Sequence, residues 1–486
     1  MSKLPDFILA LIINTMIALI LLNSFDSEIL TISFTCGFIS SFILLNSLVK
    51  WFRGKIDLFD PSFALAGLNV FILFISPVSQ VYWDFWPFLP SMIDDQEWID
   101  VWAVLNLIGV LIYVYTKDKP LTANGTKITK SIVIDNKKFV PTILIFLSLS
   151  FLSQVYIYIS FGGISGFINA FTQRQEDGLS AGDPFSGLGL IMLVAESFKI
   201  LIAIFLIYYI KITNRPHSEK SFILLMVILM VIFIFFGGLR GSRSSTLFPL
   251  IFAAGMYHFW IAPLNRRLVF IGLAGVLLFS TSYYWYKIAG TNGFSAIFDS
   301  SLRGDFHSDR QDANKYLIVR DLGRMDFQSL ALKRIYEDDF PLSFGRTYLV
   351  SIFSSIPKQI IPYKPDQITK EKTELIHGEG AYDPDGNRQT TLVLGQFGEM
   401  LVNFGVFGAL LFYFLLGRWV FWVNKMMREL SENDIRRFYL PILSFVPLLM
   451  IITDMNVIMY QLTRYLSLPT LMFVFCSKVI KQGEVT

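Results

Sequence analysis

Charged side chains are scarce in this sequence, and their scarcity limits the kinds of protein it can be. Only 16% of the 486 residues are Asp, Glu, Lys or Arg, whereas 53% are hydrophobic. Apolar runs near twenty residues recur along the chain, and this is the length needed to cross about 30 Å of hydrocarbon. The sequence therefore predicts an all-α, polytopic integral membrane protein. It contains no nucleic-acid-binding pattern and no heptad array.

Cysteine is almost absent, and sequence patterns for common catalytic sites are missing. Cys36 and Cys476 lie inside apolar runs near opposite ends of the chain, so no disulfide framework is predicted. The chain lacks a metal-ligand spacing, a Gly-x-Ser-x-Gly elbow, a Walker loop and an HExxH pattern. Hydrolase, NTPase and metalloprotease functions therefore have no support from motifs.

The apolar runs predict about twelve membrane spans. They place nine spans within 1–286 and three within 392–486, on either side of a loop over 287–391. This loop is too polar and too long to be a crossing or a simple connector. The expected spans lie at about 7–23, 29–49, 61–78, 99–115, 139–160, 187–210, 221–236, 246–262, 268–286, 392–416, 438–453 and 457–476.

The placement of Lys and Arg predicts the orientation of these spans. Cytoplasmic connectors of membrane proteins carry an excess of cations. One alternating set of connectors is rich in Lys and Arg here, and the other set of short connectors is mainly acidic. We therefore expect both termini in the cytoplasm and the 287–391 loop outside. The cationic connectors lie near 50–55, 117–138, 211–220, 266–267, 418–437 and 478–481.

Two segments of the large loop show apolar residues at helical spacing. The ranges 317–336 and 346–361 therefore predict amphipathic helices. Aromatic residues and cations accompany the second stripe, so that helix either lies along the membrane surface or caps the spans beneath it. The HGEGAYDPDGNR segment that starts at His377 has the Gly and Asp content of an irregular loop.

The segment FGGLRGSRSST at 236–246 carries two arginines that oppose the charge bias. Arg240 and Arg243 lie in a connector of about nine residues on the outer side. The next span begins there, so its unpaired amides and the positive end of its dipole point the same way. Guanidinium groups beside free N–H groups favour binding of a phosphate or pyrophosphate. The alternative is that both arginines extend to lipid headgroups.

Ionisable residues inside apolar runs also require an explanation. Glu196 and Lys199 lie three positions apart on one helical face, where an ion pair is expected, either structural or catalytic. Arg464 lies a turn or two inside the last span and must face a polar cavity or an acid. Asp454, near the same surface, is an available partner.

Glu399 and Asn403 lie one turn apart near the outer end of the tenth span. Either they cap and pack helices, or they project into a cavity below the loop. His258, in an apolar span, is interpreted as a packed or interfacial residue. His377 is expected to be exposed in the loop.

Four segments resemble the bacterial oligosaccharide repeat-unit polymerases, the Wzy-type proteins that extend O-antigen and similar surface polysaccharides. GGLRGSRSSTLFPLI follows the seventh span, and GQFGEMLVNFGVFGALLFYFLLG occupies 395–417. GRTYLVSIFSSIPKQIIPYKP at 345–365 and FGGISGFINAFTQRQ at 161–175 are also similar. The resemblance implies an all-helical fold related to the class C glycosyltransferases.

The resemblance also implies a reaction at the periplasmic face of the bacterial inner membrane. A growing glycan on undecaprenyl pyrophosphate would be transferred to a hydroxyl of the next lipid-linked repeat unit, with no metal ion, cofactor or nucleotide sugar. Expected partners are the lipid-linked oligosaccharide, membrane lipid and a chain-length regulator protein, but not nucleic acid. Two other functions stay open: the O-antigen ligase, and a flippase or transporter of lipid-linked sugars.

This chemistry assigns roles to the cations and the possible bases. Cations placed at the leaving pyrophosphate lower the barrier to breaking its bond with the sugar. Arg240 and Arg243 are the expected pyrophosphate ligands, and Glu399 or His377 is the expected general base. Further candidates for binding phosphate or glycan are Arg174, Arg346, Lys364, Asn403 and Arg464.

Overall fold

The structure is a computed structural model in which nearly every described residue of the apolar runs is helical. Helices satisfy their own backbone hydrogen bonds, which makes them suited to a hydrocarbon environment. The structure describes residues 5–22, 31–88, 92–119, 130–168, 187–213, 218–237, 239, 244–289, 318–319, 323–354, 356, 360–361, 368–383, 390 and 392–481.

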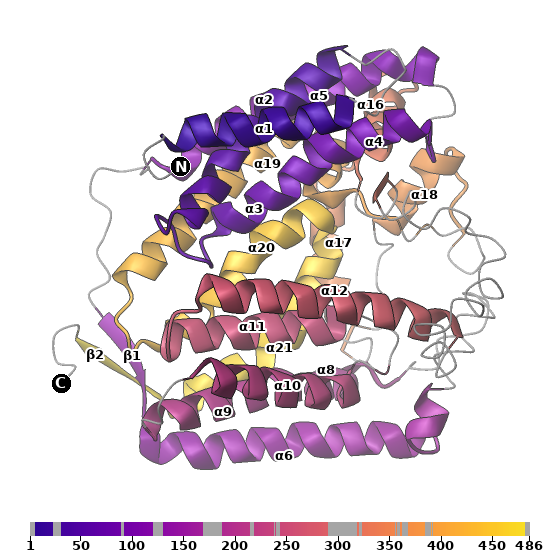
Figure 1. Cartoon of the computed structure of the whole chain (residues 1–486). Helices are drawn as coiled ribbons and strands as arrows, with labels where there is room; N and C mark the ends of the chain where they lie inside the picture. Colours follow the sequence, from indigo (N-terminus) through magenta and orange to yellow (C-terminus); the bar gives the residue numbers. More distant parts are fainter. Residues whose placement is uncertain are drawn as a thin grey trace.

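The helices form two groups, each around its own apolar core (Figure 1). The first core is built mainly from α1 (Asp6–Leu22), α2 (Thr31–Phe52), α3 (Pro61–Val70), the π-helix η1 (Phe71–Ile75), α5 (Met92–Lys117), α16 (Met325–Tyr336) and α19 (Gly395–Glu429), with α4 (Ser76–Trp83) at its edge. The second core is built from α6 (Asn136–Ser160), α8 (Gly189–Glu196), α9 (Phe198–Ile212), α10 (Glu219–Phe235), α11 (Ser244–Trp260), α12 (Arg266–Ala289), η6 (Ile435–Phe438), α20 (Leu440–Ile452) and α21 (Met455–Cys476), with α8 packed on α6 and α21.

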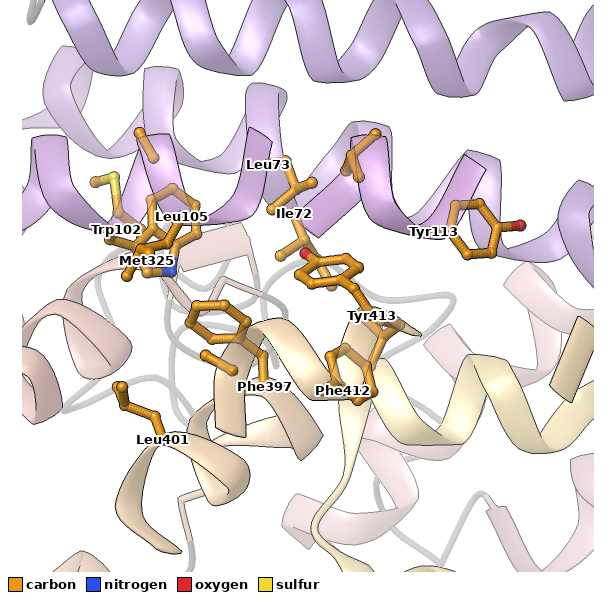
Figure 2. Packing of buried hydrophobic residues seen from close by; sticks show 14 of the residues in the cluster. Ile72, Leu73, Trp102, Leu105, Tyr113, Met325, Phe397, Leu401, Phe412 and Tyr413 are labelled. Carbon is orange, nitrogen blue, oxygen red and sulfur yellow. The ribbon is translucent and has the colours of Figure 1, made fainter. Parts of the chain in front are cut away.

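Glycine permits a close contact between helices α5 and α19 in the first core. A Cβ atom on Gly109 would lie 2.0 Å from the ring of Tyr413, and one on Gly417 would lie 2.0 Å from Thr116 Oγ1. Close approach of helix backbones at small residues is typical of membrane proteins. Figure 2 shows the ring of Tyr413 between the two helices, with Phe397 and Phe412 nearby.

Seven helices in the described part of the chain are long and apolar enough to cross a membrane. The protein is therefore an α-helical membrane protein. Every other expected span also coincides with a helix, namely α1, α10, α11, α12 or α21. Whether each of these crosses the membrane, and hence the count of about twelve, stays a prediction. The seven helices are Ile32–Phe52, Pro61–Trp83, Asp95–Lys117, Asn136–Ser160, Gly189–Ile212, Gly395–Glu429 and Ile435–Ile452.

The cationic connectors gather at one end of the molecule, which we call the connector end. Arg53 and Lys55 both bond Asp6 at 2.6 Å. Lys211 Nζ donates to Asn433 Oδ1 at 2.9 Å, and Arg436 Nη2 donates to the carbonyl of Lys130 at 2.7 Å. Connectors that the charge bias assigned to the same side therefore do lie together. Which compartment this end faces stays a prediction.

A short antiparallel sheet at the connector end departs from the all-α expectation. Strand β1 (Lys130–Ile134) pairs with β2 (Ser477–Lys481), and Ile132 lies opposite Val479. β-Branched residues favour strands, and α6 and α21 bring the two segments to the same place. In Figure 1 this sheet lies at the left.

Three helices in the described part of the large loop lie at the opposite end, which we call the loop end. They are α16 (Met325–Tyr336), α17 (Arg346–Ser354) and α18 (Thr369–His377). Lys333 Nζ of α16 bonds Asp95 Oδ1 at 2.5 Å, at the start of α5. The helix expected over 317–336 begins at Met325, two residues after Gly323. A Cβ atom at Gly323 would lie 2.2 Å from the carbonyl oxygen of Val319.

Two further helix boundaries differ from the sequence-based expectation. The helix expected over 346–361 is described only to Ser354, three residues before Pro357, which cannot donate to a helix. The span expected at 392–416 is a helix that runs on to Glu429 and is broken at Gly405, where φ is 63° and ψ is −156°. Val406 N donates to the hydroxyl of Tyr336 at this break, at 3.0 Å.

Candidate functional site

Two buried polar clusters contact α21 at different points along its length. Asp454 and Met455 at the start of α21 belong to one cluster, and Arg464, farther along the same helix, belongs to the other. Together the clusters include most of the described residues that the sequence singled out. Each is built from side chains that are almost entirely buried.

The first cluster, which we call the ion cluster, contains Glu196, Lys199 and Arg464. Lys199 Nζ donates to Glu196 Oε2 at 2.6 Å, and Arg464 Nε donates to the same oxygen at 2.5 Å. The three residues are 1%, 0% and 5% exposed. The Glu196–Lys199 pair expected from sequence is therefore present, and Arg464 joins it. Two cations share one carboxylate in a place where unpaired charge is costly.

The helix is interrupted between Glu196 and Lys199. Helix α8 ends at Glu196 and α9 begins at Phe198, with Ser197 between them. The hydroxyl of Ser197 donates to the carbonyl of Leu193 at 3.1 Å and to that of Arg464 at 3.0 Å. The interruption thus ties the sixth expected span to α21 beside the ion cluster.

The ion cluster also touches both ends of the connector that carries Arg240 and Arg243. Lys199 Nζ donates to the backbone carbonyl of Ser245 at 3.0 Å, and the hydroxyl of Ser245 donates to the backbone carbonyl of Gly237 at 2.8 Å. A Cβ atom at Gly237 would lie only 2.4 Å from Lys199 Nζ. The connector therefore leaves and re-enters the helices at the ion cluster. Arg240 and Arg243 themselves lie outside the described residues, as do Arg174 and Lys364.

The second cluster, which we call the carboxylate network, surrounds Glu399. Its Oε1 accepts from the hydroxyl of Thr347 at 2.8 Å, and its Oε2 accepts from Gln396 Nε2 at 2.8 Å and from Met455 N at 2.7 Å. Asn403 Nδ2 donates to Thr347 Oγ1 at 2.8 Å. Glu399 and Asn403 are both 0% exposed. This geometry favours the packing alternative for the pair, because their polar atoms join α17, α19 and α21.

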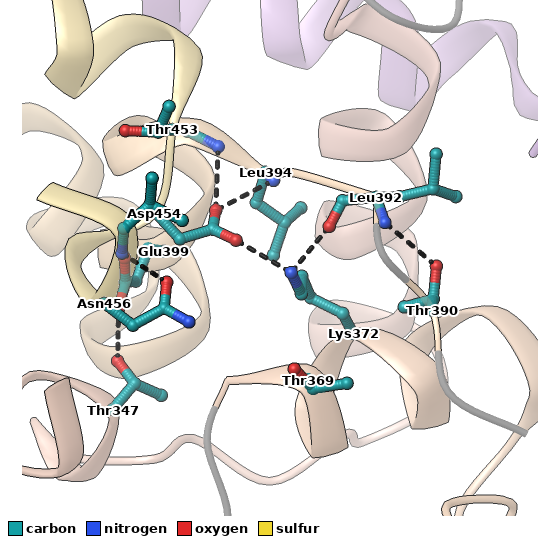
Figure 3. Close-up of polar contacts among 12 residues, drawn as sticks. Thr347, Thr369, Lys372, Thr390, Leu392, Leu394, Glu399, Thr453, Asp454 and Asn456 are labelled. Carbon is teal, nitrogen blue, oxygen red and sulfur yellow. Dashed lines mark hydrogen bonds and ion pairs between the residues drawn. The ribbon is translucent and has the colours of Figure 1, made fainter. Parts of the chain in front are cut away.

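A buried ion pair extends this network to α18. Lys372 Nζ donates to Asp454 Oδ2 at 2.8 Å and to the carbonyl of Leu392 at 2.6 Å. Asp454 Oδ1 accepts from the backbone amides of Leu394 and Gly395 at 3.0 and 3.2 Å. Figure 3 shows Lys372 reaching from α18 to Asp454. Asp454 therefore pairs with Lys372, and the pairing with Arg464 offered by the sequence is wrong.

The remaining described candidates lie on the loop helices and at the connector end. Arg346, at the start of α17, pairs with Glu371 of α18. His377 is exposed at the end of α18, as expected. His258 is buried and bonds Asp57 at 3.0 Å, in agreement with its interpretation as a packed residue.

No family model, curated protein or solved structure matches this chain. The resemblance to repeat-unit polymerases therefore rests on the four sequence segments alone. Within the part of the chain that the structure describes, no three His, Cys, Asp or Glu side chains are grouped so that they could bind a metal ion.

Sequence reasoning missed several residues of the two clusters. Lys372 and Thr347 lie in loop segments where one cation or hydroxyl among many carries no distinguishing signal. Gln396 precedes Glu399 by three positions, a spacing that places both on one helical face and could have been used. The partners themselves come from α17, α18 and α21, which no local pattern connects.

Proposed function

We propose that this protein is a polymerase of lipid-linked oligosaccharide repeat units that acts at the loop end. The hydroxyl oxygen of one lipid-linked unit attacks the anomeric carbon of a second glycan. The bond between that carbon and the pyrophosphate oxygen breaks, and undecaprenyl pyrophosphate leaves with both bonding electrons. The hydroxyl proton passes to a base or to water. Neither a nucleotide sugar nor a metal ion enters this reaction.

The observation that carries the proposal is the position of the ion cluster at both ends of the Arg240–Arg243 connector. Lys199 bonds the carbonyl of Ser245, and Ser245 in turn bonds Gly237. Two cations in the cluster share the single carboxylate of Glu196. Arg240 and Arg243 add two more cations within a few residues of chain. This concentration of positive charge suits a leaving diphosphate, whose charge develops as the sugar bond breaks.

The two expected general bases differ in their access to a substrate. Glu399 accepts three hydrogen bonds inside the carboxylate network, and its side chain is not exposed. His377 is exposed at the end of α18. We therefore assign the acceptor proton to His377 before Glu399, because a general base must reach the hydroxyl that it deprotonates. We also propose that Arg346 and Arg464 contact glycan or phosphate while they stay paired with Glu371 and Glu196.

Purified protein in proteoliposomes, supplied with a polyprenyl-pyrophosphate-linked repeat unit, tests the proposal. The expected product is a ladder of longer glycans together with released polyprenyl pyrophosphate. Arg240→Ala and Arg243→Ala should each slow chain extension about a hundred- to thousandfold, the usual effect of losing one such donor. Arg267→Ala is the matched control, because Arg267 is highly exposed at the connector end, where it lies 3.5 Å from Glu219.

The same preparation separates the polymerase from its two alternatives. A ligase would require a lipid A-core acceptor and would make no ladder from the repeat unit alone. A flippase would change the leaflet of the lipid-linked unit without releasing pyrophosphate. Normal-length polymer from both arginine variants would show that the pyrophosphate assignment is wrong.

A further inference from the structure

Helix α17 has the polarity of its faces reversed relative to a water-exposed helix. Leu349, Ile352 and Phe353 are 62%, 50% and 43% exposed. Thr347 and Ser351 are each 1% exposed, on the opposite face. An amphipathic helix in water turns its apolar stripe inward and its polar residues outward. The arrangement in α17 is the one expected where the surroundings are less polar than the protein interior.

The buried polar face of α17 is fully engaged with the protein. The hydroxyl of Thr347 donates to Glu399, and the hydroxyl of Ser351 donates to the carbonyl of Thr347 at 2.6 Å. Helix α17 packs along α21 (Figure 1). Its orientation is therefore determined by the carboxylate network, and the apolar face cannot turn inward without breaking these bonds.

The exposed face of α17 continues an apolar stripe on α19. Beyond the break at Gly405, Phe407, Phe414, Leu415 and Trp422 are all at least one-third exposed. The last three follow Phe407 by seven, eight and fifteen positions, so all four lie on one side of the helix. This side faces lipid where α19 crosses the membrane. Phe404 lies at the other side of the break. A Cβ atom at Gly345 would lie 3.3 Å from its ring, so the stripe reaches the residue before α17.

The irregular backbone between these helices is satisfied by protein groups. Ser343 N and Phe344 N donate to the carbonyls of Val402 and Asn403 at 3.1 and 3.0 Å. Gly345 N donates to Asn403 Oδ1 at 2.9 Å. Phe344 is itself 79% exposed. The three backbone amides of this turn are therefore satisfied by protein groups and need no water.

We propose that the exposed face of α17 lies against the bilayer, with Leu349, Ile352 and Phe353 in contact with lipid acyl chains, while Arg346 at the start of the helix stays paired with Glu371. The proposal goes beyond the proposed function and does not depend on it. Continuity with the α19 stripe argues for lipid as the occupant. The segment expected to belong to a large outer loop thus covers the carboxylate network from the lipid side.

Spin-label accessibility in proteoliposomes tests this placement. Cys36→Ala and Cys476→Ala first remove the two native thiols, both of which are buried. Single cysteines are then introduced as Leu349→Cys, Ile352→Cys and Phe353→Cys and are labelled with a nitroxide. Leu415→Cys is the lipid-facing reference on α19, and Glu379→Cys is the reference at an exposed position after α18.

The expected result is that labels at 349, 352 and 353 collide with oxygen more than with a water-soluble nickel chelate, as at 415. The reverse preference is expected at 379. Preferential collision with the nickel chelate at 352 and 353 would overturn the proposal. Protection from both reagents would also overturn it, because a protein surface or a second copy of the chain would then cover this face.

A measurement on the unsubstituted protein gives an independent result. Phospholipids with a diazirine in the acyl chain are incorporated into the proteoliposomes and activated by light. Adducts are expected on the peptide that contains 349–353 and absent from the peptide that contains 379–383. Adducts on 407–422 serve as the positive control. If they form there but not on the peptide that contains 349–353, lipid contact of α17 is contradicted.

Discussion

Arg464 on α21 and Glu196 at the end of α8 form a buried ion pair across 268 positions of the chain. The pair joins the last helix to the middle of the second helical group, and Lys199 binds the same carboxylate oxygen. The sequence did not predict this pair, because it offered Asp454 as the acid for Arg464. Because Asp454 is bonded to Lys372, the two acids near α21 have distinct roles in joining distant segments.

Removing the carboxylate of the ion cluster should destabilise the protein strongly. Glu196→Gln leaves two buried cations without their shared acid, and loss of one partner of a buried pair typically costs about 3–5 kcal/mol. Glu219→Gln is the control, since Glu219 forms a half-exposed contact with Arg267 and should change stability by less than about 1 kcal/mol. Thermal unfolding in detergent measures both variants. Equal midpoints for the two would contradict the importance of the cluster.

The ion pair between Lys372 and Asp454 should fix α18 against the start of α21. Lys372→Met removes the only cation bonded to Asp454 among the described residues and is expected to expose the backbone of 368–383 to hydrogen exchange. The expected loss is about 3–5 kcal/mol of local stability. Lys370→Met on the same helix is the matched control. If both variants exchange like the unsubstituted protein, this ion pair does not determine the position of α18.

Substitution of Gly405 should affect the break in α19. Its φ of 63° and ψ of −156° are accessible mainly to glycine, and a Cβ there would lie 2.7 Å from the hydroxyl of Tyr336. Gly405→Ala is expected to cost about 1–3 kcal/mol through backbone strain. Gly272→Ala is the control, because a Cβ at Gly272 in α12 meets nothing within 4 Å. Unfolding in detergent should separate them, and a neutral Gly405→Ala would contradict the strained geometry.

Asp326 at the start of α16 should make stability depend on pH. Burial raises its pKa to about 7, and its Oδ1 accepts from Phe327 N at 2.8 Å. Between about pH 4 and pH 7 the folded state therefore binds more protons than the unfolded state, so the free energy of unfolding falls as pH rises. Above about pH 7 the loss is complete.

Asp326→Asn keeps the shape of the side chain and removes this titration. The variant is expected to unfold at a higher temperature than the unsubstituted protein at pH 8, with the difference shrinking as pH falls to about 5. Thermal unfolding at a series of pH values measures that difference. A difference that does not change with pH would show that Asp326 does not titrate in this window.

Much of the fold follows from local sequence patterns. Each expected span coincides with a helix because a run of apolar residues near twenty long has one common solution in lipid, an α-helix that satisfies its own backbone. The bias of Lys and Arg also grouped the connectors correctly, as the contacts of Arg436 with Lys130 and of Lys211 with Asn433 show. The break at Gly405 was missed because it depends on a contact with Tyr336 made after folding. The end of α17 before Pro357, by contrast, has a local cause.

The sequence by itself determined a helical membrane protein with cationic connectors and a large polar segment, since length, hydropathy and charge bias are properties of neighbouring residues. Only the tertiary structure decided which charges meet. Arg464 pairs with Glu196, Lys372 pairs with Asp454, and Thr347 bonds Glu399. The reason is that buried ions must find partners within a few ångströms in space, and the identity of those partners depends on how helices far apart in the chain pack together.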